Sequence, residues 1–426
     1  MNRSVAFKTL GCRLNQSETD SLVSEFHHAG YSIVDFSDSA DVYIINTCTV
    51  TTQSDKKSRN LISQISRRNK NALVMVTGCM VNNYRDTLKD IPRSFYYIEN
   101  NFKNSILSMV ESHFMGNIIE PEKFKPGVFD FNAADTTFHT RSMIKIQDGC
   151  DHYCTFCIVP FVRGEAVSRP ANDIFNNIRK IIDSGFHEIV ITGVNIGRYN
   201  YEDTDFDDLI EKILALSGDF RVRISSIEPE GFSDKLIRLF SHPKMMPHLH
   251  LCLQSGSDQI LKKMRRMYST GVYLSIIDKI RHFYNDFNFT TDIMVGFPGE
   301  TEEDFEATCR VVREIGFSHI HTFKYSRRKG TIADHLPDQV PGKVKNERSE
   351  IIRNISIENK RNYRNSLIGK TQNVLVEKVR GKYSRGYGEL YVPIEFRHAE
   401  MNKNMFQEVI LTGLSEGEDP ILSGKI

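Results

Sequence analysis

The sequence predicts an α/β protein in three parts. Strand-like and helix-like runs alternate over residues 4–115 and again from residue 141, which is typical of parallel sheets covered by helices. The last sixty residues instead carry strand-like runs with no helix between them, which is typical of a small β-barrel. We therefore expect domains over residues 1–115, 136–366 and 367–426.

The first domain is predicted to be a doubly wound parallel sheet. A helix is expected over residues 15–30, with polar residues ahead of it and Gly30 at its end. Residues 116–140 show no periodicity and are predicted to form a linker. The expected strands are residues 5–10, 41–47, 72–77 and 95–98.

The second domain is predicted to be a partial (β/α)6 barrel of the TIM type, although the same pattern also fits an open doubly wound sheet. In the run HLHLCLQ, three leucines alternate with His250, Cys252 and Gln254. The leucines should pack on helices, and the other three side chains should face the lumen. The expected strands are residues 143–147, 187–192, 221–225, 248–254, 290–295 and 319–325.

The third domain is predicted to be a small antiparallel β-barrel of a kind that often binds oligonucleotides. Its expected strands are residues 372–380, 387–396, 406–413 and 421–426. Residues 341–385 hold twelve Lys and Arg against four Asp and Glu. This local positive charge suits a nucleic acid, and a solvated helix followed by an ordinary strand pair is the alternative.

Composition narrows the class of protein. The chain has 55 Lys and Arg against 54 Asp and Glu, so any basic surface must be local. No run approaches a membrane span, and the first residues lack the apolar segment of a secretory signal. We expect a cytoplasmic protein without a membrane partner, whose eight cysteines stay reduced and serve metal binding or catalysis.

Three cysteines, Cys150, Cys154 and Cys157, follow the first strand of the second domain. Three thiolates can hold a 4Fe-4S cluster and leave one iron open to a small molecule. The alternative is a structural zinc site with His152 as the fourth ligand. A position at the mouth of a barrel favours ligand binding.

The first domain repeats this arrangement at longer range. Cys12, Cys48 and Cys79 each follow a predicted strand. Because the carboxyl ends of parallel strands meet at one edge of a sheet, these thiols can converge on a second cluster. Three independent buried cysteines are the alternative.

The CxxxCxxC spacing resembles that of radical S-adenosylmethionine (SAM) enzymes, in which SAM completes the cluster and is reductively cleaved to methionine and a 5′-deoxyadenosyl radical. Phe156 matches the aromatic residue that usually precedes the last cysteine in that superfamily. Cys252 and Cys309 have no partner at ligand spacing and should pack in the interior. Further expected SAM contacts at successive strand ends are Thr192, Gly193, Glu228, Gln254, Asp292 and Gly296.

Two three-cysteine sites, a barrel and a small β-domain together resemble the methylthiotransferase family over essentially the whole chain. That family has an N-terminal methylthiotransferase domain, a radical SAM core and a TRAM domain. The segments TLGCRLNQSE (9–18), NTCTVTTQSD (46–55) and VTGC (76–79) are most similar to the branch that modifies N6-threonylcarbamoyladenosine beside the tRNA anticodon. The resemblance implies that the second cluster carries the sulfur inserted at C2 of the adenine, and that a second SAM methylates it.

The same resemblance implies the partners: a tRNA anticodon stem-loop, a reducing electron donor and a sulfur source. It singles out no side-chain acid or base, because the cofactors carry the radical chemistry. Two alternative activities are methylthiolation of isopentenyladenosine in tRNA and methylthiolation of a ribosomal protein. A non-catalytic iron-sulfur or zinc protein that binds RNA is the alternative from another class.

Overall fold

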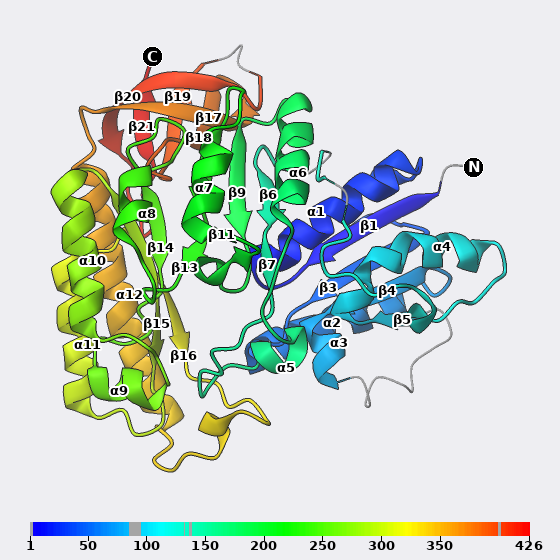
Figure 1. Ribbon diagram of the computed structural model, residues 1–426, viewed down its shortest axis with the longest axis horizontal. Helices are drawn as coiled ribbons and strands as arrows, with labels where there is room; N and C mark the ends of the chain where they lie inside the picture. The colour runs from blue at the N-terminus through cyan, green and yellow to red at the C-terminus, as the bar shows by residue number, and fades with distance from the viewer. Residues whose placement is uncertain (1–2, 85–94, 132, 136–138, 399–401) are drawn as a thin grey trace.

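The computed structural model describes residues 3–84, 95–131, 133–135, 139–398 and 402–426. Figure 1 shows an N-terminal α/β part (blue to cyan) beside a central core, with a C-terminal barrel (orange to red) over one end of the core strands. The predicted start of the second domain, residue 136, lies outside the described residues. Within the predicted linker, the described residues include a short 3-10 helix, Pro121–Lys123 (η3).

The N-terminal part is the predicted doubly wound parallel sheet, with strand order β2-β1-β3-β4-β5. Helices α1 and α4 pack on one face, and α2 packs on the other. Among the strands of the described residues here, the three-residue β2 is the one that the sequence did not predict. The elements are β1 (Ser4–Thr9), α1 (Arg13–His28), β2 (Ser32–Val34), β3 (Val42–Thr47), α2 (Thr52–Arg68), β4 (Leu73–Gly78), α3 (Cys79–Tyr84), β5 (Phe95–Ile98), η2 (Asn100–Ser105) and α4 (Ile106–Phe114).

The core is an open parallel barrel in the order β6-β9-β12, continued by β13-β14-β15-β16. In the described part of the chain its two edge strands, β6 and β16, do not pair. Leu249, Leu251 and Leu253 are fully buried in the main hydrophobic core, as the alternation predicted. The strands are β6 (Ser142–Lys145), β9 (Glu188–Thr192), β12 (Arg221–Ile224), β13 (Ser226–Ile227), β14 (His248–Leu251), β15 (Asn288–Val295) and β16 (His319–Lys324).

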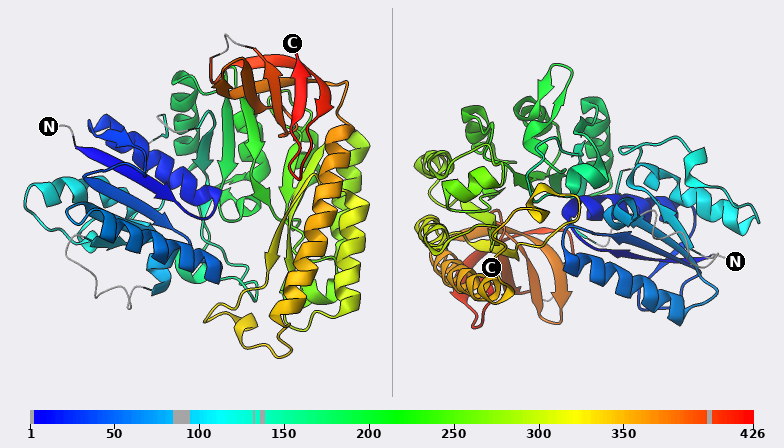
Figure 2. Two further views of the ribbon diagram at one scale, coloured as in Figure 1. Left: turned by 180° about the vertical axis from the view of Figure 1, so that it is seen from behind. Right: turned by 90° about the horizontal axis from the view of Figure 1, so that it is seen from below.

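Helices cover the outside of these strands: α6 (Ala171–Asp183), α7 (Phe206–Leu214), α8 (Asp234–Leu239), α9 (Asp258–Lys263), α10 (Thr270–Phe283), α11 (Glu302–Ile315) and α12 (Gly342–Asn365). Figure 2 shows α12 running from the C-terminal barrel along the core. Short elements occupy the loops: β7 (Gln147–Asp148), α5 (Val159–Arg163), β8 (Val167–Ser168), η4 (Ile196–Arg198), β10 (Asn200–Tyr201), β11 (Thr204–Asp205) and η5 (Ile332–Asp334). None of the described helices is long and apolar enough to span a membrane.

The C-terminal barrel is closed in the order β17-β18-β19-β21-β20. The prediction of a purely antiparallel barrel is wrong, because β19 and β21 pair in parallel. A closed ring with an odd number of strands cannot alternate direction throughout, and the run expected as one strand over 387–396 divides between β18 and β19. The strands are β17 (Thr371–Arg380), β18 (Tyr383–Tyr387), β19 (Pro393–Arg397), β20 (Phe406–Leu414) and β21 (Leu422–Lys425).

Buried arginines join this barrel to the amino ends of the core strands. The two terminal nitrogens of Arg221 donate to the carbonyl oxygens of Asn373 and Tyr387, at 3.0 and 2.9 Å. Arg223 donates to the carbonyl oxygens of the turn after β18. Burial alone would raise the pKa of Glu188, but Arg221 and Arg223 hold it well below its usual range. This carboxylate therefore stays ionised and fixes both guanidinium groups.

A second buried ion cluster joins the N-terminal part to the core. Glu18 of α1 accepts from Lys103, from Lys145 at 2.8 Å and from Arg163 at 3.0 Å. Arg163 also pairs with Asp148 at 3.0 Å. All five side chains are at most 6% exposed. The cluster contains three cations and two carboxylates, so one positive charge is left over.

Removing the charge of Glu18 should be costly. We expect Glu18→Gln to lower the free energy of unfolding by about 3 kcal/mol or more, because it leaves buried cations uncompensated. Burial alone would raise the pKa of Glu18, but Arg163, with two lysines, holds it well below its usual range. The advantage of the wild type should therefore be full above the pKa of the unfolded carboxyl and be lost as the pH falls toward the folded value.

Denaturant titration of both proteins, at neutral and acidic pH, measures this difference. Glu306→Gln is the matched control, because Glu306 is 63% exposed and pairs with Arg310 at 4.0 Å; its cost should stay within about 0.5 kcal/mol. Equal effects of the two substitutions at neutral pH would show that the buried cluster does not join the domains.

Candidate active site

The N-terminal cysteines converge at the carboxyl edge of the sheet, as predicted. Thr47 and Gly78 are register partners at the ends of β3 and β4. Cys48 directly follows Thr47, and Cys79 directly follows Gly78. Cys12 is the residue before the first turn of α1. Burial raises the pKa of Cys48, and the thiols of Cys79 and Cys12 raise it further. The three sulfurs are therefore close enough to interact electrostatically.

Two glycines permit this convergence. Gly11 has φ of +99°, and a Cβ there would lie 2.9 Å from the sulfur of Cys48. Gly78 also has φ of +99°, and a Cβ there would lie 2.3 Å from the carbonyl oxygen of Thr47. Any larger residue would combine a left-handed backbone with a steric clash. The glycines that precede Cys12 and Cys79 are therefore part of the site.

The loop of the second cysteine triad packs directly against the first triad. Ile158 and Val162, which follow Cys157, form a buried apolar cluster with Cys79. Asn100 donates to the carbonyl oxygen of Val162 at 2.9 Å. Helix α5 therefore lies between the two triads.

Arg163, the last residue of α5, places its positive charge beside the N-terminal thiols. Burial alone would lower the pKa of Arg163, but Asp148 and Glu18 hold it well above its usual range. The thiols of Cys79 and Cys12 contribute in the same direction. The unbalanced positive charge of the ion cluster thus faces a site that becomes anionic when thiolates bind a metal.

The second triad lies at the carboxyl end of the core strands. Burial, with the neighbouring Cys154, raises the pKa of Cys157 to about 12. Arg266 lies with Nη1 3.3 Å from the sulfur of Cys154, and its Nη2 pairs with Glu228. His152, the alternative zinc ligand, has Nε2 2.7 Å from a carboxylate oxygen of Glu230. Each triad thus has one buried arginine beside it.

A cavity of about 620 Å³ runs along the lumen of the open barrel. The three parts of the chain all contribute to its wall: Cys12 and Arg13 from the first, residues on or next to β9, β13, β14, β15 and β16 from the core, and Tyr387 and Tyr391 from the C-terminal barrel. A second cavity of about 1050 Å³ lies on the other side of Cys12 and is also lined by Cys48. Cys12 is shared by both cavities.

The residues predicted to contact SAM divide into two groups. Thr192, Gly193 and Asp292 line the lumen cavity. The others are not among the residues that line it. Phe156 packs edge-on against Phe297, and Gln254 bridges to β15 through its backbone. At Gly296, a Cβ would lie 2.4 Å from Lys345.

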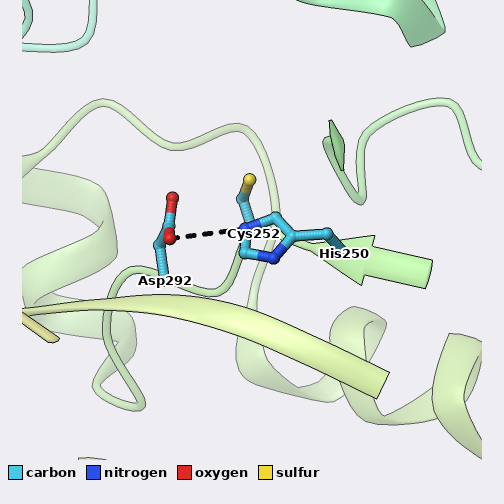
Figure 3. Close-up of side chains that lie close together, drawn as sticks. All are labelled: His250, Cys252 and Asp292. Atoms are coloured by element: carbon cyan, nitrogen blue, oxygen red, sulfur yellow. Dashed lines mark ion pairs between the residues drawn. The ribbon is translucent and has the colours of Figure 1, made fainter. Parts of the chain in front are cut away.

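Cys252 lies closer to polar groups than the sequence indicated. Its sulfur, a ring nitrogen of His250 and a carboxylate oxygen of Asp292 all lie within 4.8 Å of one another (Figure 3). Asp292 is 3.3 Å from His250, and the other ring nitrogen of His250 is 3.0 Å from the hydroxyl of Thr290. Both imidazole nitrogens therefore have partners within the protein. Cys309 packs in the main core, as expected.

Tyr391 is a cavity residue that the sequence did not predict. It has φ of +56° in the turn between β18 and β19, and its hydroxyl accepts from Arg13 at 3.2 Å. Its ring lies 4.4 Å from the guanidinium of Arg223 and 4.8 Å from the ring of His248. Tyr391 thus connects the C-terminal barrel to the residue that follows Cys12. Nothing in the run GELYVPI distinguishes it from an ordinary strand residue.

Comparison with known families defines the class first. Residues 144–312 match the model of the radical SAM superfamily, and residues 4–98 match the model described as Uncharacterized protein family UPF0004. This protein is therefore a radical SAM enzyme, whose core binds a 4Fe-4S cluster and SAM.

Curated relatives define the family. The threonylcarbamoyladenosine tRNA methylthiotransferase MtaB of Thermotoga maritima is 35% identical over 97% of this chain and 95% of its own length. The Bacillus subtilis protein of the same name is 37% identical over 81% and 78%. The tRNA-2-methylthio-N(6)-dimethylallyladenosine synthase of Endomicrobium trichonymphae is 35% identical over 88% of each chain. The chain belongs to the radical SAM methylthiotransferase family.

Solved structures agree with the fold. The radical SAM methyltransferase TsrM of Kitasatospora setae superposes with a TM-score of 0.55 at 13% identity, covering 78% of this chain and 77% of its own. The cobalamin-dependent enzyme OxsB gives a TM-score of 0.51 at 9% identity, covering 85% of this chain and 56% of its own. At these identities the likeness concerns the fold alone.

The tight backbone at Gly78 generates a prediction. Gly78→Ala should lower the free energy of unfolding by about 2 kcal/mol more than Gly30→Ala, because only the first adds a clash to the left-handed strain. Gly30 is a matched control, with φ of +84° and no atom within 4 Å of the position that a Cβ would take. Urea titration measures both, and equal losses would show that the strand edge relaxes without cost.

Proposed function

We propose that this enzyme inserts a methylthio group at C2 of N6-threonylcarbamoyladenosine in tRNA. The observation that carries the choice of substrate is the polarity of the lumen cavity. Its wall contains histidines, hydroxyl groups and four cationic side chains, Arg13, Lys360, Arg364 and Arg385. A threonylcarbamoyl group is polar and anionic, whereas an isopentenyl group would require an apolar wall.

The two cysteine triads are proposed as cluster ligands. Cys150, Cys154 and Cys157 would hold the cluster that binds SAM, and Cys12, Cys48 and Cys79 would hold a second 4Fe-4S cluster. Groups of three thiols suit iron-sulfur ligation, and the excess positive charge at Arg163 suits an anionic cluster beside it. When bound, the clusters and SAM supply the radical, the sulfur and the methyl group. The protein orients the adenine between the two triads and keeps water out of the lumen.

We propose that SAM lies against Thr192, Gly193 and Asp292 on the cavity wall. Gln254, Phe156 and Gly296 would support this wall from behind. Arg266 is fixed by Glu228 on one side and contacts the sulfur of Cys154 on the other. Glu228 would therefore act on the SAM cluster through Arg266.

The tRNA anticodon stem-loop would bind the hairpin of β17 and β18. Lys378, Arg380 and Lys382 are exposed there, beside the exposed aromatic ring of Tyr383. Cations that contact phosphate supply affinity without sequence information, and an aromatic side chain can stack on an unpaired base. The reaction also requires an electron donor and a sulfur source, and we infer that it takes place in the cytoplasm.

Nucleoside analysis tests the substrate. Transfer RNA from a strain that lacks the gene should lose 2-methylthio-N6-threonylcarbamoyladenosine and accumulate N6-threonylcarbamoyladenosine, as measured by liquid chromatography and mass spectrometry. The wild-type gene should restore the methylthio nucleoside, whereas genes for Cys48→Ala and Cys154→Ala should not. Loss of the methylthio group from isopentenyladenosine, or from a ribosomal protein, would overturn the assignment.

The same two variants, purified and reconstituted without oxygen, separate the clusters. Cys154→Ala should not cleave SAM. Cys48→Ala should still release 5′-deoxyadenosine and should contain about four irons instead of about eight. Thermal unfolding checks that both variants are folded, because a lost cluster can destabilise its domain. A folded Cys48→Ala that modifies tRNA at the wild-type rate would refute the role of the N-terminal triad.

The basic hairpin generates a further prediction. Replacing Lys378, Arg380 and Lys382 by Gln should weaken tRNA binding and reduce the slope of log Kd against log salt by about 2, because each phosphate contact releases counterions. A triple replacement of Lys279, Arg310 and Arg313, which are exposed on α10 and α11, is the matched control. Equal slopes for the two triple variants would place the tRNA contact elsewhere.

A further inference from the structure

A pair of buried cations lies in the lumen cavity, near the C-terminal barrel. Lys360 and Arg364 stand one turn apart on α12, and both line the cavity. Each is within 3.1 Å of the same carboxylate oxygen of Asp419. The side chains of Lys360 and Arg364 are only 10% and 9% exposed, whereas that of Asp419 is 67% exposed. A carboxylate on a surface loop thus reaches in to a buried pair of cations.

Asp419 does not occupy all the hydrogen-bond donors of Lys360 and Arg364. The Nε of Arg364 is buried and has no hydrogen-bond partner among the described residues. Arg385 also lines the cavity and acts on the pKa of Arg364 as a neighbouring positive charge. Around this end of the cavity, three cations face the single carboxylate of Asp419. A buried cationic site with spare donors is suited to a second carboxylate.

The neighbouring wall is neutral and polar. Burial, together with His321 and Lys360, lowers the pKa of His319 to about 4, so this imidazole is uncharged at neutral pH. His319 lies 3.3 Å from His321, and the rings of His321 and His250 are 5.6 Å apart. A row of imidazoles therefore leads from the cation pair along the lumen to Asp292, on the same cavity wall as Cys12.

We infer that Lys360 and Arg364 bind the carboxylate of the threonyl group of the substrate, and that Asp419 occupies this place until the substrate displaces it. The inference rests on the proposed substrate and deepens it by naming the residues that read its charge. Displacement of Asp419 leaves neither cation unpaired, because the substrate carboxylate takes its place while the largely exposed Asp419 returns to solvent. The substrate carboxylate would gain a guanidinium and an ammonium that are already desolvated and held in place by the helix.

Two other roles would give different behaviour. If the cations contacted tRNA phosphates, their removal would weaken every stem-loop equally, whatever its nucleoside. If Asp419 only fastened the loop before β21 to α12, its removal would reduce stability and leave substrate affinity unchanged. A thermodynamic cycle that varies both the protein and the charge of the ligand distinguishes all three.

The experiment measures the Kd of anticodon stem-loop RNAs by fluorescence anisotropy with the full-length protein. One RNA carries N6-threonylcarbamoyladenosine, and a second carries the same nucleoside with its carboxylate converted to a carboxamide. Arg364→Met and Lys360→Met should each weaken binding of the first RNA about 10-fold, or about 1.4 kcal/mol, and leave the second within about 2-fold. Arg364→Lys should keep part of the discrimination, because it retains the charge but not the planar fork.

Asp419→Asn should change the affinity in the opposite direction. Removing the competing carboxylate should tighten binding of the first RNA several-fold and leave the carboxamide RNA unchanged. Lys370→Met, at a cation that pairs with Asp286 outside the cavity, is the charge-matched control and should change the Kd of the two RNAs by the same factor. Equal losses on both RNAs for Arg364→Met, or unchanged or weaker binding for Asp419→Asn, would overturn the inference.

The same assay separates this inference from the substrate proposal. A third RNA carries isopentenyladenosine. If the wild-type protein binds this RNA more tightly than the threonylcarbamoyl RNA, the proposed substrate is wrong and the inference falls with it. If the wild type prefers the threonylcarbamoyl RNA but Arg364→Met and Lys360→Met weaken binding of the carboxylate and carboxamide RNAs by the same factor, the substrate stands and only the role of Lys360 and Arg364 is refuted.

Discussion

The buried ion cluster around Glu18 is the constraint on which the rest of the structure depends. Glu18 lies on α1, which starts directly after Cys12, and its partner Arg163 comes six residues after Cys157. One carboxylate thus fixes a residue near each cysteine triad. Buried charges are tolerated only when all partners are in place, so the cluster permits a single docking of the N-terminal part on the core. That docking fixes the position of the first cysteine triad relative to the second.

The C-terminal barrel closes the other end of the lumen by similar means. Glu188 fixes Arg221 and Arg223, which donate to backbone carbonyls of the barrel, while Tyr391 reaches Arg13. Residues from the N-terminal part, the core and the C-terminal barrel therefore all line the cavity. In the proposed assignment, the radical chemistry takes place at the carboxyl ends of the strands and the carboxylate of the substrate is bound near their amino ends.

Most of the architecture could be predicted from the sequence, because alternating βα patterns and hydrophobic periodicity are local signals. The convergence of Cys12, Cys48 and Cys79 also followed from parallel strands, since their carboxyl ends must meet. The parallel pairing of β19 with β21 could not be predicted, because it follows from the number of strands in the closed barrel. The end of β18 and the start of β19 read in the sequence as a single strand. The buried positions of Arg163, Arg364 and Tyr391 could not be predicted either. An isolated arginine or tyrosine carries no local signal that it will be buried against a charge from a distant segment. Twelve basic residues over 341–385 read as one surface, yet Lys360 and Arg364 point into the cavity while Lys378 and Arg380 are exposed.

The central proposal is that each of the two cysteine triads holds an iron-sulfur cluster. Anomalous diffraction at the iron absorption edge, from crystals of the protein reconstituted without oxygen, tests it most directly. We expect two separate clusters of anomalous density, one at Cys12, Cys48 and Cys79 and one at Cys150, Cys154 and Cys157. Iron at the second triad alone, or density at a zinc edge in place of iron, would contradict it.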